Sequence, residues 1–201
     1  EMLAKLQAGS TGWDVFVPTN YAISTYKDLG LIEPLDLKRL PNYDPSTQEQ
    51  RFTAEGSIDG VVYAVPKDWG TTGFVYNSKA MPQKPTSWKE FWDLVQNEAT
   101  GRAMVHDYQL TTIGNALKYY GYSFNSNDEK ELADAEKLAI ASKPHLFGIN
   151  SDYKPSLISG DAWTSVCWTG DATQLQRDMP EMKYVLAKAG GENWSDFYAI
   201  H

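Results

Sequence analysis

Short β-rich runs alternate with helical segments along almost the whole chain, and this alternation constrains the fold more than any other feature. Strand-like runs lie at residues 13–18, 61–66, 73–77, 102–106, 146–149, 163–168, 183–187 and 194–200. Helical patterns lie at residues 1–8, 20–29, 91–95, 110–120, 128–141, 155–158 and 170–179. Strands that alternate with helices of about ten to fifteen residues predict an α/β fold with a largely parallel sheet.

Two segments interrupt this pattern, and a third marks a helix start. Residues 33–60 are rich in Pro, Asp, Gln and Ser without a sustained period, which predicts a long surface connection. Residues 67–72 predict a polar insert between two strands. Ser87 and Glu90 have the spacing of a capping box, which predicts that a helix follows them.

The composition excludes some classes of partner. The 201 residues carry 18 Lys and Arg against 26 Asp and Glu, a net charge of −8. Nucleic acids and anionic membranes bind clustered Lys and Arg, so an acidic chain disfavours both partners. No apolar run approaches the ~20 residues that a membrane-spanning helix needs. We therefore expect no nucleic-acid partner and no direct membrane insertion in this segment.

Cysteine and histidine give no sign of a metal site or cofactor. Cys167 is the only cysteine, which rules out an intramolecular disulfide, a CxxC pair and a zinc cluster of thiolates within this chain. Because it stands in an apolar stretch, we expect it to be a small buried side chain. The three histidines are far apart in sequence and lack metal-binding spacing.

The chain opens on Glu1 rather than Met, without a signal peptide, and its helical periodicity starts at the first residue. We therefore expect the sequence to begin part-way through a longer protein.

Tryptophan and aspartate follow two of the predicted strands. Trp168 ends one strand and Asp171 stands near the start of the next helix, while Trp194 and Asp196 share one face of the last strand. Indole faces attract an ammonium group and carboxylates supply charge-assisted hydrogen bonds, so the two pairs predict a site for a small organic cation. Taken singly, Asp171 could cap its helix and Trp194 could fill a core. The tryptophans at positions 13, 88, 92 and 163 are expected to be ordinary core residues.

Enzymatic patterns are weaker, and we assign no catalytic residue. His106 and Asp107 follow a strand and could pair as a base and its orienting carboxylate, but we interpret them as a solvent-exposed loop pair. Glycoside hydrolases also place paired carboxylates among aromatic rings, with Asp171 and Asp196 as acid and nucleophile in that alternative. A tethered sensor domain with the same binding site is a third class.

Assembled in order, these segments resemble the extracellular solute-binding proteins of ABC importers, specifically the spermidine/putrescine-binding branch. The most specific motif is residues 63–77, which look like the family's crossover between lobes; other matching motifs are residues 3–18, 86–88, 120–125, 147–151 and 194–200. The resemblance implies a periplasmic-binding-protein-like α/β fold of two lobes, with mixed and parallel sheets and a ligand cleft, in which the first lobe is incomplete. It also implies a periplasmic or extracellular location, with a signal or lipid anchor ahead of residue 1. Residues 1–75 would belong to the first lobe and its crossover strand, residues 76–190 to the second lobe, and residues 191–201 to the returning strand.

The resemblance also assigns roles to single residues. Thr19 and Tyr21 look like cleft residues of the first lobe, and Trp168 resembles the aromatic residue that stacks on a polyamine chain. Asp171 and Asp196 resemble the carboxylates that hold an ammonium, and Trp194 resembles a second cleft aromatic.

Two positions depart from the family pattern. Its polyamine binders typically carry acidic residues where this chain has Tyr108 and Thr111. The loss of one acidic pole favours a ligand with one cationic end and a polar or neutral remainder, with putrescine or spermidine as the alternative. The resemblance further implies that the lobes close on this ligand and that a membrane permease recognises the closed form.

Overall fold

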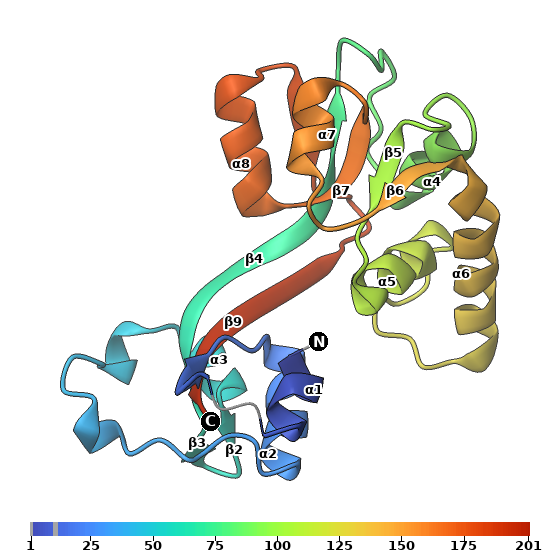
Figure 1. Cartoon of the computed structure of the whole chain (residues 1–201). Coiled ribbons are helices and arrows are strands. Elements are labelled where there is room, and N and C mark those ends of the chain that lie inside the picture. Colours follow the sequence, from blue (N-terminus) through green and yellow to red (C-terminus); the bar gives the residue numbers. More distant parts are fainter. Residues whose placement is uncertain (1, 10–11) are drawn as a thin grey trace. The chain divides into compact units, whose positions relative to one another are not determined.

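The computed structural model describes residues 2–9 and 12–201, which form two compact units (Figure 1). Unit 1 comprises Glu1–Trp69 with Trp194–His201, and unit 2 comprises Gly70–Asn193. The chain passes between the units twice, along the strands β4 (Ala64–Asn77) and β9 (Glu192–Ile200). The borders between the two units lie at residues 69/70 and 193/194. The lobe borders expected from the family resemblance lie at residues 75/76 and 190/191.

Unit 1 is built from short elements around a small core. Its elements are α1 (Met2–Gln7), β1 (Val15–Phe16), α2 (Asn20–Asp28), the 3₁₀ helices η1 (Leu37–Arg39) and η2 (Pro45–Thr47), α3 (Gln50–Glu55), β2 (Ser57–Ile58) and β3 (Val61–Val62). β1 pairs antiparallel with β9, and β2 pairs antiparallel with β3. The core joins Leu6 of α1, Ile23 of α2 and Phe197 of β9, so the last strand is an integral part of this unit.

Unit 2 holds most of the sheet and the larger helices. Its further elements are α4 (Trp88–Gln96), β5 (Ala103–Val105), α5 (Gln109–Tyr119), α6 (Glu129–Ser142), η3 (Lys143–His145), β6 (Leu146–Ile149), α7 (Lys154–Ser159), β7 (Thr164–Trp168), α8 (Thr169–Asp178) and β8 (Met182–Val185). β5 is parallel to β6 and β7, but β4 is antiparallel to both β7 and β8. The prediction of a largely parallel sheet is therefore wrong, because the long strand that enters from unit 1 and the strand β8 that follows α8 both run against their neighbours.

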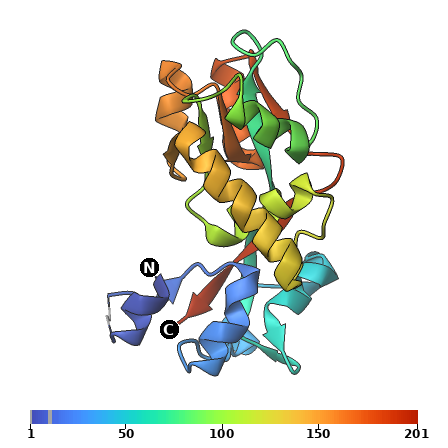
Figure 2. The same ribbon diagram turned by 90° about the vertical axis from the view of Figure 1, so that its right-hand side faces the viewer.

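Alternate residues of β4 bury against opposite faces of this sheet. Phe74 and Tyr76 lie in a cluster with residues of α4, α5 and α6, while Val75 lies in a second cluster with residues of α7 and α8. Successive side chains of a strand point to opposite faces, so both faces are covered by helices. Figure 2 shows α6 lying along one side of unit 2, where it packs against α5.

The capping box and the buried cysteine are confirmed. The Ser87 side chain accepts a hydrogen bond from the Glu90 backbone N–H at 3.2 Å, and the Glu90 carboxylate accepts one from the Thr86 backbone N–H at 2.6 Å. These backbone and side-chain donors lower the pKa of Glu90. Cys167 is fully buried, and burial raises the pKa of its thiol to about 12.

Two expectations for unit 1 and its border are wrong. The supposed surface connection at residues 33–60 contains η1, η2, α3 and β2, and Phe52 of α3 is buried. Asp36 and Asp44 cap the two 3₁₀ helices by accepting backbone N–H groups at 3.0 and 2.9 Å. Residues 67–72 are not an insert, because β4 runs through them as one continuous strand. Elements of two to six residues are too short to show a period in sequence.

Candidate ligand-binding site

An aromatic group stands at the carboxyl ends of β5 and β7 in unit 2. The indole of Trp168, the last residue of β7, has its ring centroid 4.6 Å from that of His106, 5.9 Å from Tyr108 and 6.0 Å from Tyr153. Trp168 is partly exposed and Tyr108 is exposed, whereas His106 and Tyr153 are buried beneath them. Ligands of open α/β sheets bind beyond the carboxyl ends of strands, so this group lies where the sequence analysis places a site.

His106 supports this group and is not an exposed loop residue, so that interpretation is wrong. Its side chain is 1% exposed and stacks on Tyr153 at 5.3 Å, and among the described residues neither ring nitrogen meets a partner in hydrogen-bond geometry. Burial lowers its pKa to about 4, which outweighs the opposing effects of Asp107, the Val166 backbone and Asp171. The imidazole is therefore neutral at pH 7. Asp107 does not orient it, since that carboxylate accepts the Ser151 backbone N–H at 3.1 Å.

Asp171 lies in the first turn of α8, and both of its carboxylate oxygens have partners. One accepts the Tyr153 hydroxyl at 2.8 Å, and the other accepts the Lys154 ammonium at 2.9 Å. The Tyr153 hydroxyl also accepts the Trp168 backbone N–H at 3.1 Å. Asp171 thus holds Tyr153 under Trp168, and Lys154 already compensates its charge.

A carboxylate that the sequence analysis missed lies next to Thr111. Glu192, the first residue of β9, accepts the Thr72 hydroxyl at 2.5 Å and the Thr111 hydroxyl at 2.9 Å. The surroundings of Thr111 are therefore acidic, and the expectation of a neutral pole there is wrong. The spacing of Glu192, Trp194 and Asp196 at every second residue is the signal that could have revealed it.

In unit 1 the structure brings together Thr19 and Asp196, two of the residues that the resemblance assigns to the cleft. The Thr19 hydroxyl donates to the Asp196 carboxylate at 2.7 Å, and the two residues form an isolated antiparallel bridge. Burial raises the pKa of Asp196; the Thr19 hydrogen bond and Lys67 oppose this shift and Asp68 adds to it. Tyr21, in the first turn of α2, is 52% exposed.

Trp194 shares its strand with Asp196. Ser195 and Phe197 between and beyond them are buried, while Trp194 and Asp196 are partly exposed on the other face of β9. Within the described residues the buried indole N–H of Trp194 has no acceptor. The residue as a whole is only partly covered, whereas Trp88 and Trp92 are buried in the core.

The model of the bacterial extracellular solute-binding protein family matches residues 1–200. The chain belongs to this family. A putrescine/cadaverine-binding protein of Pseudomonas aeruginosa is 32% identical over 100% of this chain and 59% of its own length. A spermidine/putrescine-binding periplasmic protein of Escherichia coli is 28% identical over 99% of this chain and 57% of its own length. The chain thus spans less than two thirds of the length of these relatives.

Solved structures carry the same fold. A Listeria monocytogenes structure assigned to a spermidine/putrescine ABC transporter is 29% identical, with a TM-score of 0.87 over 99% of this chain and 61% of that one. A Streptococcus pneumoniae spermidine/putrescine substrate-binding protein is 27% identical, with a TM-score of 0.73 over 99% of this chain and 60% of that one. The periplasmic-binding-protein fold expected from the resemblance is confirmed.

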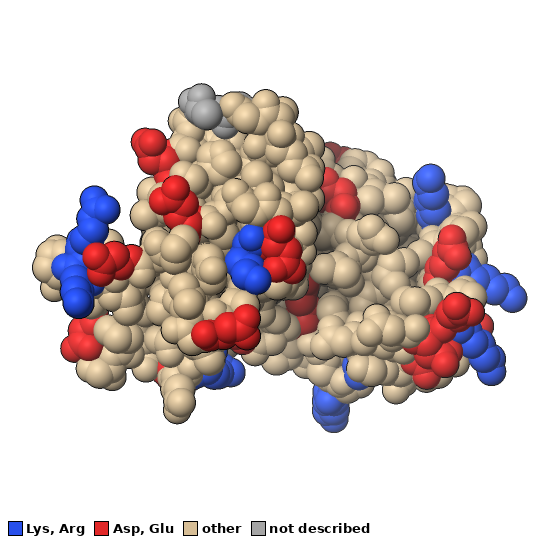
Figure 3. All heavy atoms as spheres, turned by 90° about the horizontal axis from the view of Figure 1, so that it is seen from below, with Lys and Arg blue, Asp and Glu red and all other residues tan. Residues whose placement is uncertain are grey.

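Charged side chains of both signs occur on the surface of this chain. On the face drawn in Figure 3, the Lys and Arg side chains are spread out and interspersed with Asp and Glu side chains. Among the described residues, no helix has the length and apolar character to span a membrane, and no group of three or more His, Cys, Asp or Glu side chains is placed to hold a metal ion.

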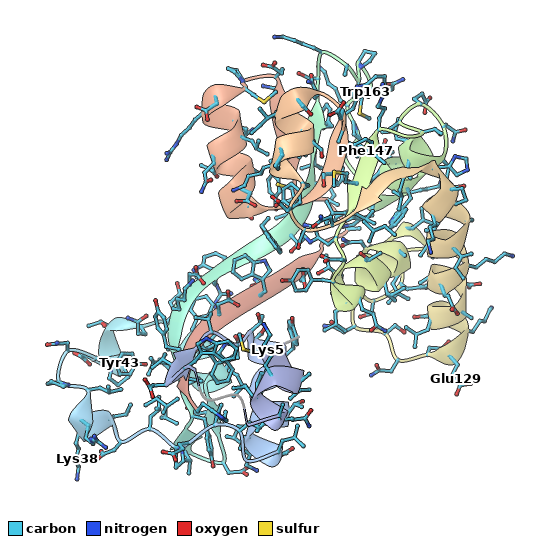
Figure 4. All side chains as sticks on the ribbon, viewed as in Figure 1. Lys5, Lys38, Tyr43, Glu129, Phe147 and Trp163 are labelled. Carbon is cyan, nitrogen blue, oxygen red and sulfur yellow. The ribbon has the colours of Figure 1, made fainter. Side chains whose placement is uncertain are left out.

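Aromatic residues outside the site have other roles. Trp88 and Trp92 of α4 are buried in the core as expected, but Trp13 is 37% exposed, so its assignment to the core is wrong. Trp163, labelled in Figure 4, precedes β7 at the end of the strand opposite Trp168 and stacks under the Arg102 guanidinium at 5.5 Å. Trp163 therefore offers a matched control for Trp168.

Proposed function

We propose that this chain is the ligand-binding part of an extracellular or periplasmic solute-binding protein that captures a small organic amine for an ABC importer and delivers it to the membrane permease. The observation that carries the proposal is the pairing of aromatic faces with carboxylates in a member of this family. In unit 2 the rings of Trp168 and Tyr108 contact each other, and Glu192 binds Thr111, three residues after Tyr108. In unit 1 Asp196 stands two residues after Trp194 on β9. The names of the relatives, which include putrescine, cadaverine and spermidine, support the same class of ligand.

This combination suits an amine with an apolar chain. An ammonium over a desolvated indole gains roughly 2 kcal/mol, and a charge-assisted hydrogen bond to a carboxylate gains roughly 1.5 to 3 kcal/mol. Methylene groups pack on the remaining ring surface. The two polar contributions sum to about 3.5 to 5 kcal/mol, so packing of the methylene groups has to supply the rest of the about 8 kcal/mol that corresponds to micromolar binding.

Calorimetry on the full-length protein tests the proposal. Putrescine, spermidine and the mono-amine butylamine would each be titrated into the purified protein. We expect heat of binding with at least one of these amines and none with uncharged butanol. Absence of binding for all three amines would contradict the proposal.

We also propose that the chain is not an enzyme. The glycoside hydrolase alternative needs Asp171 as a proton donor or nucleophile, yet Lys154 and Tyr153 occupy both of its oxygens. We expect no release of nitrophenol from a panel of nitrophenyl glycosides. Sustained turnover of any of these substrates would overturn the proposal that the chain is not an enzyme.

A further inference from the structure

We propose that Glu192 determines specificity by binding a second ammonium group, so that ligands with two cationic ends are preferred over those with one. This inference rests on the proposed function, which by itself requires only an amine. It concerns a residue that lies two positions before Trp194 and to which the sequence analysis assigns no role.

The hydrogen bonds of Glu192 leave its charge uncompensated. Its two donors, Thr72 and Thr111, are neutral hydroxyl groups and are 0% and 3% exposed, while Glu192 itself is partly exposed. Among the described residues, no Lys or Arg lies within ion-pair distance of this carboxylate. A carboxylate has about four acceptor sites, so it can accept further donors on its open side.

Asp171 provides the contrast within the same unit. Its ion pair with Lys154 compensates its charge, with an Nζ to Oδ1 distance of 2.9 Å. A partly buried carboxylate without such a partner is stabilised by any cation that reaches it. Of these two acidic groups in unit 2, Glu192 is thus the one prepared to receive a cation from outside.

The backbone before Glu192 is fixed against β4. Gly190 has a φ of +83°, and its carbonyl accepts the buried indole N–H of Trp88 at 3.0 Å. A Cβ at Gly191 would lie 2.9 Å from the Thr72 backbone oxygen, closer than real Cβ atoms come. The chain therefore approaches β4 as closely as a glycine allows, and this approach sets the Glu192 carboxylate over the Thr72 hydroxyl.

The same position adjoins the aromatic group. Thr72 is the register partner of Trp168 in the antiparallel pair of β4 and β7, which places their Cα atoms about 5 Å apart. Thr111 lies three residues after Tyr108, the N-cap of α5, and the Tyr108 ring contacts Trp168. We expect that a ligand whose methylene chain packs on the rings of Trp168 and Tyr108 can place its terminal ammonium at the Glu192 carboxylate.

Calorimetry with two ligands of equal length tests the inference on the full-length protein. The ligands are 1,4-diaminobutane and 4-aminobutan-1-ol, in which a neutral hydroxyl replaces one ammonium. We expect the wild type to prefer the diamine by about tenfold or more. Glu192→Gln should weaken diamine binding by about ten- to hundredfold and leave the amino alcohol within about twofold, because only the diamine uses the charge.

Positioning of the carboxylate has its own test. Thr111→Val removes one hydroxyl donor and should reduce the preference for the diamine, whereas Thr111→Ser keeps the donor and should restore it. Glu136→Gln, at an exposed position of α6, removes the same charge far from any of these contacts and should leave both affinities unchanged.

The outcomes separate the two proposals. If the wild type binds neither of these two ligands nor spermidine nor butylamine, the proposed function fails. If it binds the diamine and Glu192→Gln binds it equally well, or loses both ligands to the same extent, the role of Glu192 is overturned while the proposed function stands. Circular dichroism spectra and thermal midpoints of each variant would show that the folded protein is compared in every case.

Discussion

Thr19 donates a hydrogen bond of 2.7 Å to Asp196, although the two residues are 177 positions apart. The bond joins the residue that precedes α2 to the strand β9, so the last strand of the chain brings a carboxylate to a first-unit residue. A neutral hydroxyl holds the carboxylate in place without compensating its charge. Asp196 is thereby oriented and remains able to bind a cation.

Replacing Asp196 with Asn should weaken amine binding by roughly 1.5 to 3 kcal/mol, because the ammonium loses a charged acceptor. Calorimetry with putrescine measures this change. Asp28→Asn, which removes an exposed carboxylate that pairs with the neighbouring Lys27, is the matched control and should bind as the wild type does. Equal affinities for Asp196→Asn and wild type would remove Asp196 from the site.

In the absence of ligand, Asp196→Asn should be more stable than the wild type. Burial raises the pKa of Asp196, so the folded chain binds this proton more tightly than the unfolded chain and loses stability as the carboxyl ionises with rising pH. At pH 7 the neutral Asn avoids this cost and still accepts the Thr19 hydroxyl. We expect a higher thermal midpoint for Asp196→Asn at pH 7, and a gain that vanishes at pH values below the pKa of an unfolded aspartate. A lower midpoint at pH 7 would contradict the effect of burial.

Trp168→Leu should reduce amine affinity by about 2 kcal/mol, or about thirtyfold, because the ammonium loses the indole face. Trp163→Leu is the control, since that indole stacks with Arg102 outside the site. Calorimetry on both variants measures the contrast. Similar losses in the two variants would mean that general stability, and not contact with the ligand, explains the result.

The longer helices and most strands could be predicted from sequence because their signals are local. The capping residues Ser87 and Glu90 are three positions apart, and α6 shows its period within its own 14 residues. The candidate site contains contacts that local patterns did not predict. The bonds from Glu192 to Thr111 and Thr72 span 81 and 120 residues, and no local pattern contains such a contact.

Burial of polar groups was the second feature that local patterns did not show. His106 stands between apolar Val105 and acidic Asp107, which is consistent with a strand end at the surface. Its cover comes from Tyr153 and Trp168, which are supplied by later segments of the chain. A sequence pattern describes the neighbours along the chain, whereas burial depends on neighbours in space.

His106 should make the protein less stable in mild acid. Its pKa is lowered from 6.5 to about 4 by burial, so between these values the unfolded chain binds more protons and stability falls as the pH falls. The loss is at most about 3 kcal/mol. Urea unfolding at pH 7 and pH 4.5 should show this decrease in the wild type and a smaller one in His106→Phe. His145→Gln, which alters a partly exposed histidine at the end of η3, should keep the full decrease.

The family resemblance implies that Asp171 binds the ligand directly, whereas its contacts in the structure indicate that it positions Tyr153. A substitution of Asp171 distinguishes these two roles. Its oxygens bind Tyr153 and Lys154, so Asp171→Asn should lower the free energy of unfolding by about 1 kcal/mol; water around the partly exposed Lys154 limits the loss. Amine affinity should fall less than in Asp196→Asn, because Asn can still accept the Tyr153 hydroxyl under Trp168. If the affinity falls as much as in Asp196→Asn, the ligand must displace Lys154. In that case, Lys154→Met should strengthen amine binding, because it frees the carboxylate that the ammonium needs.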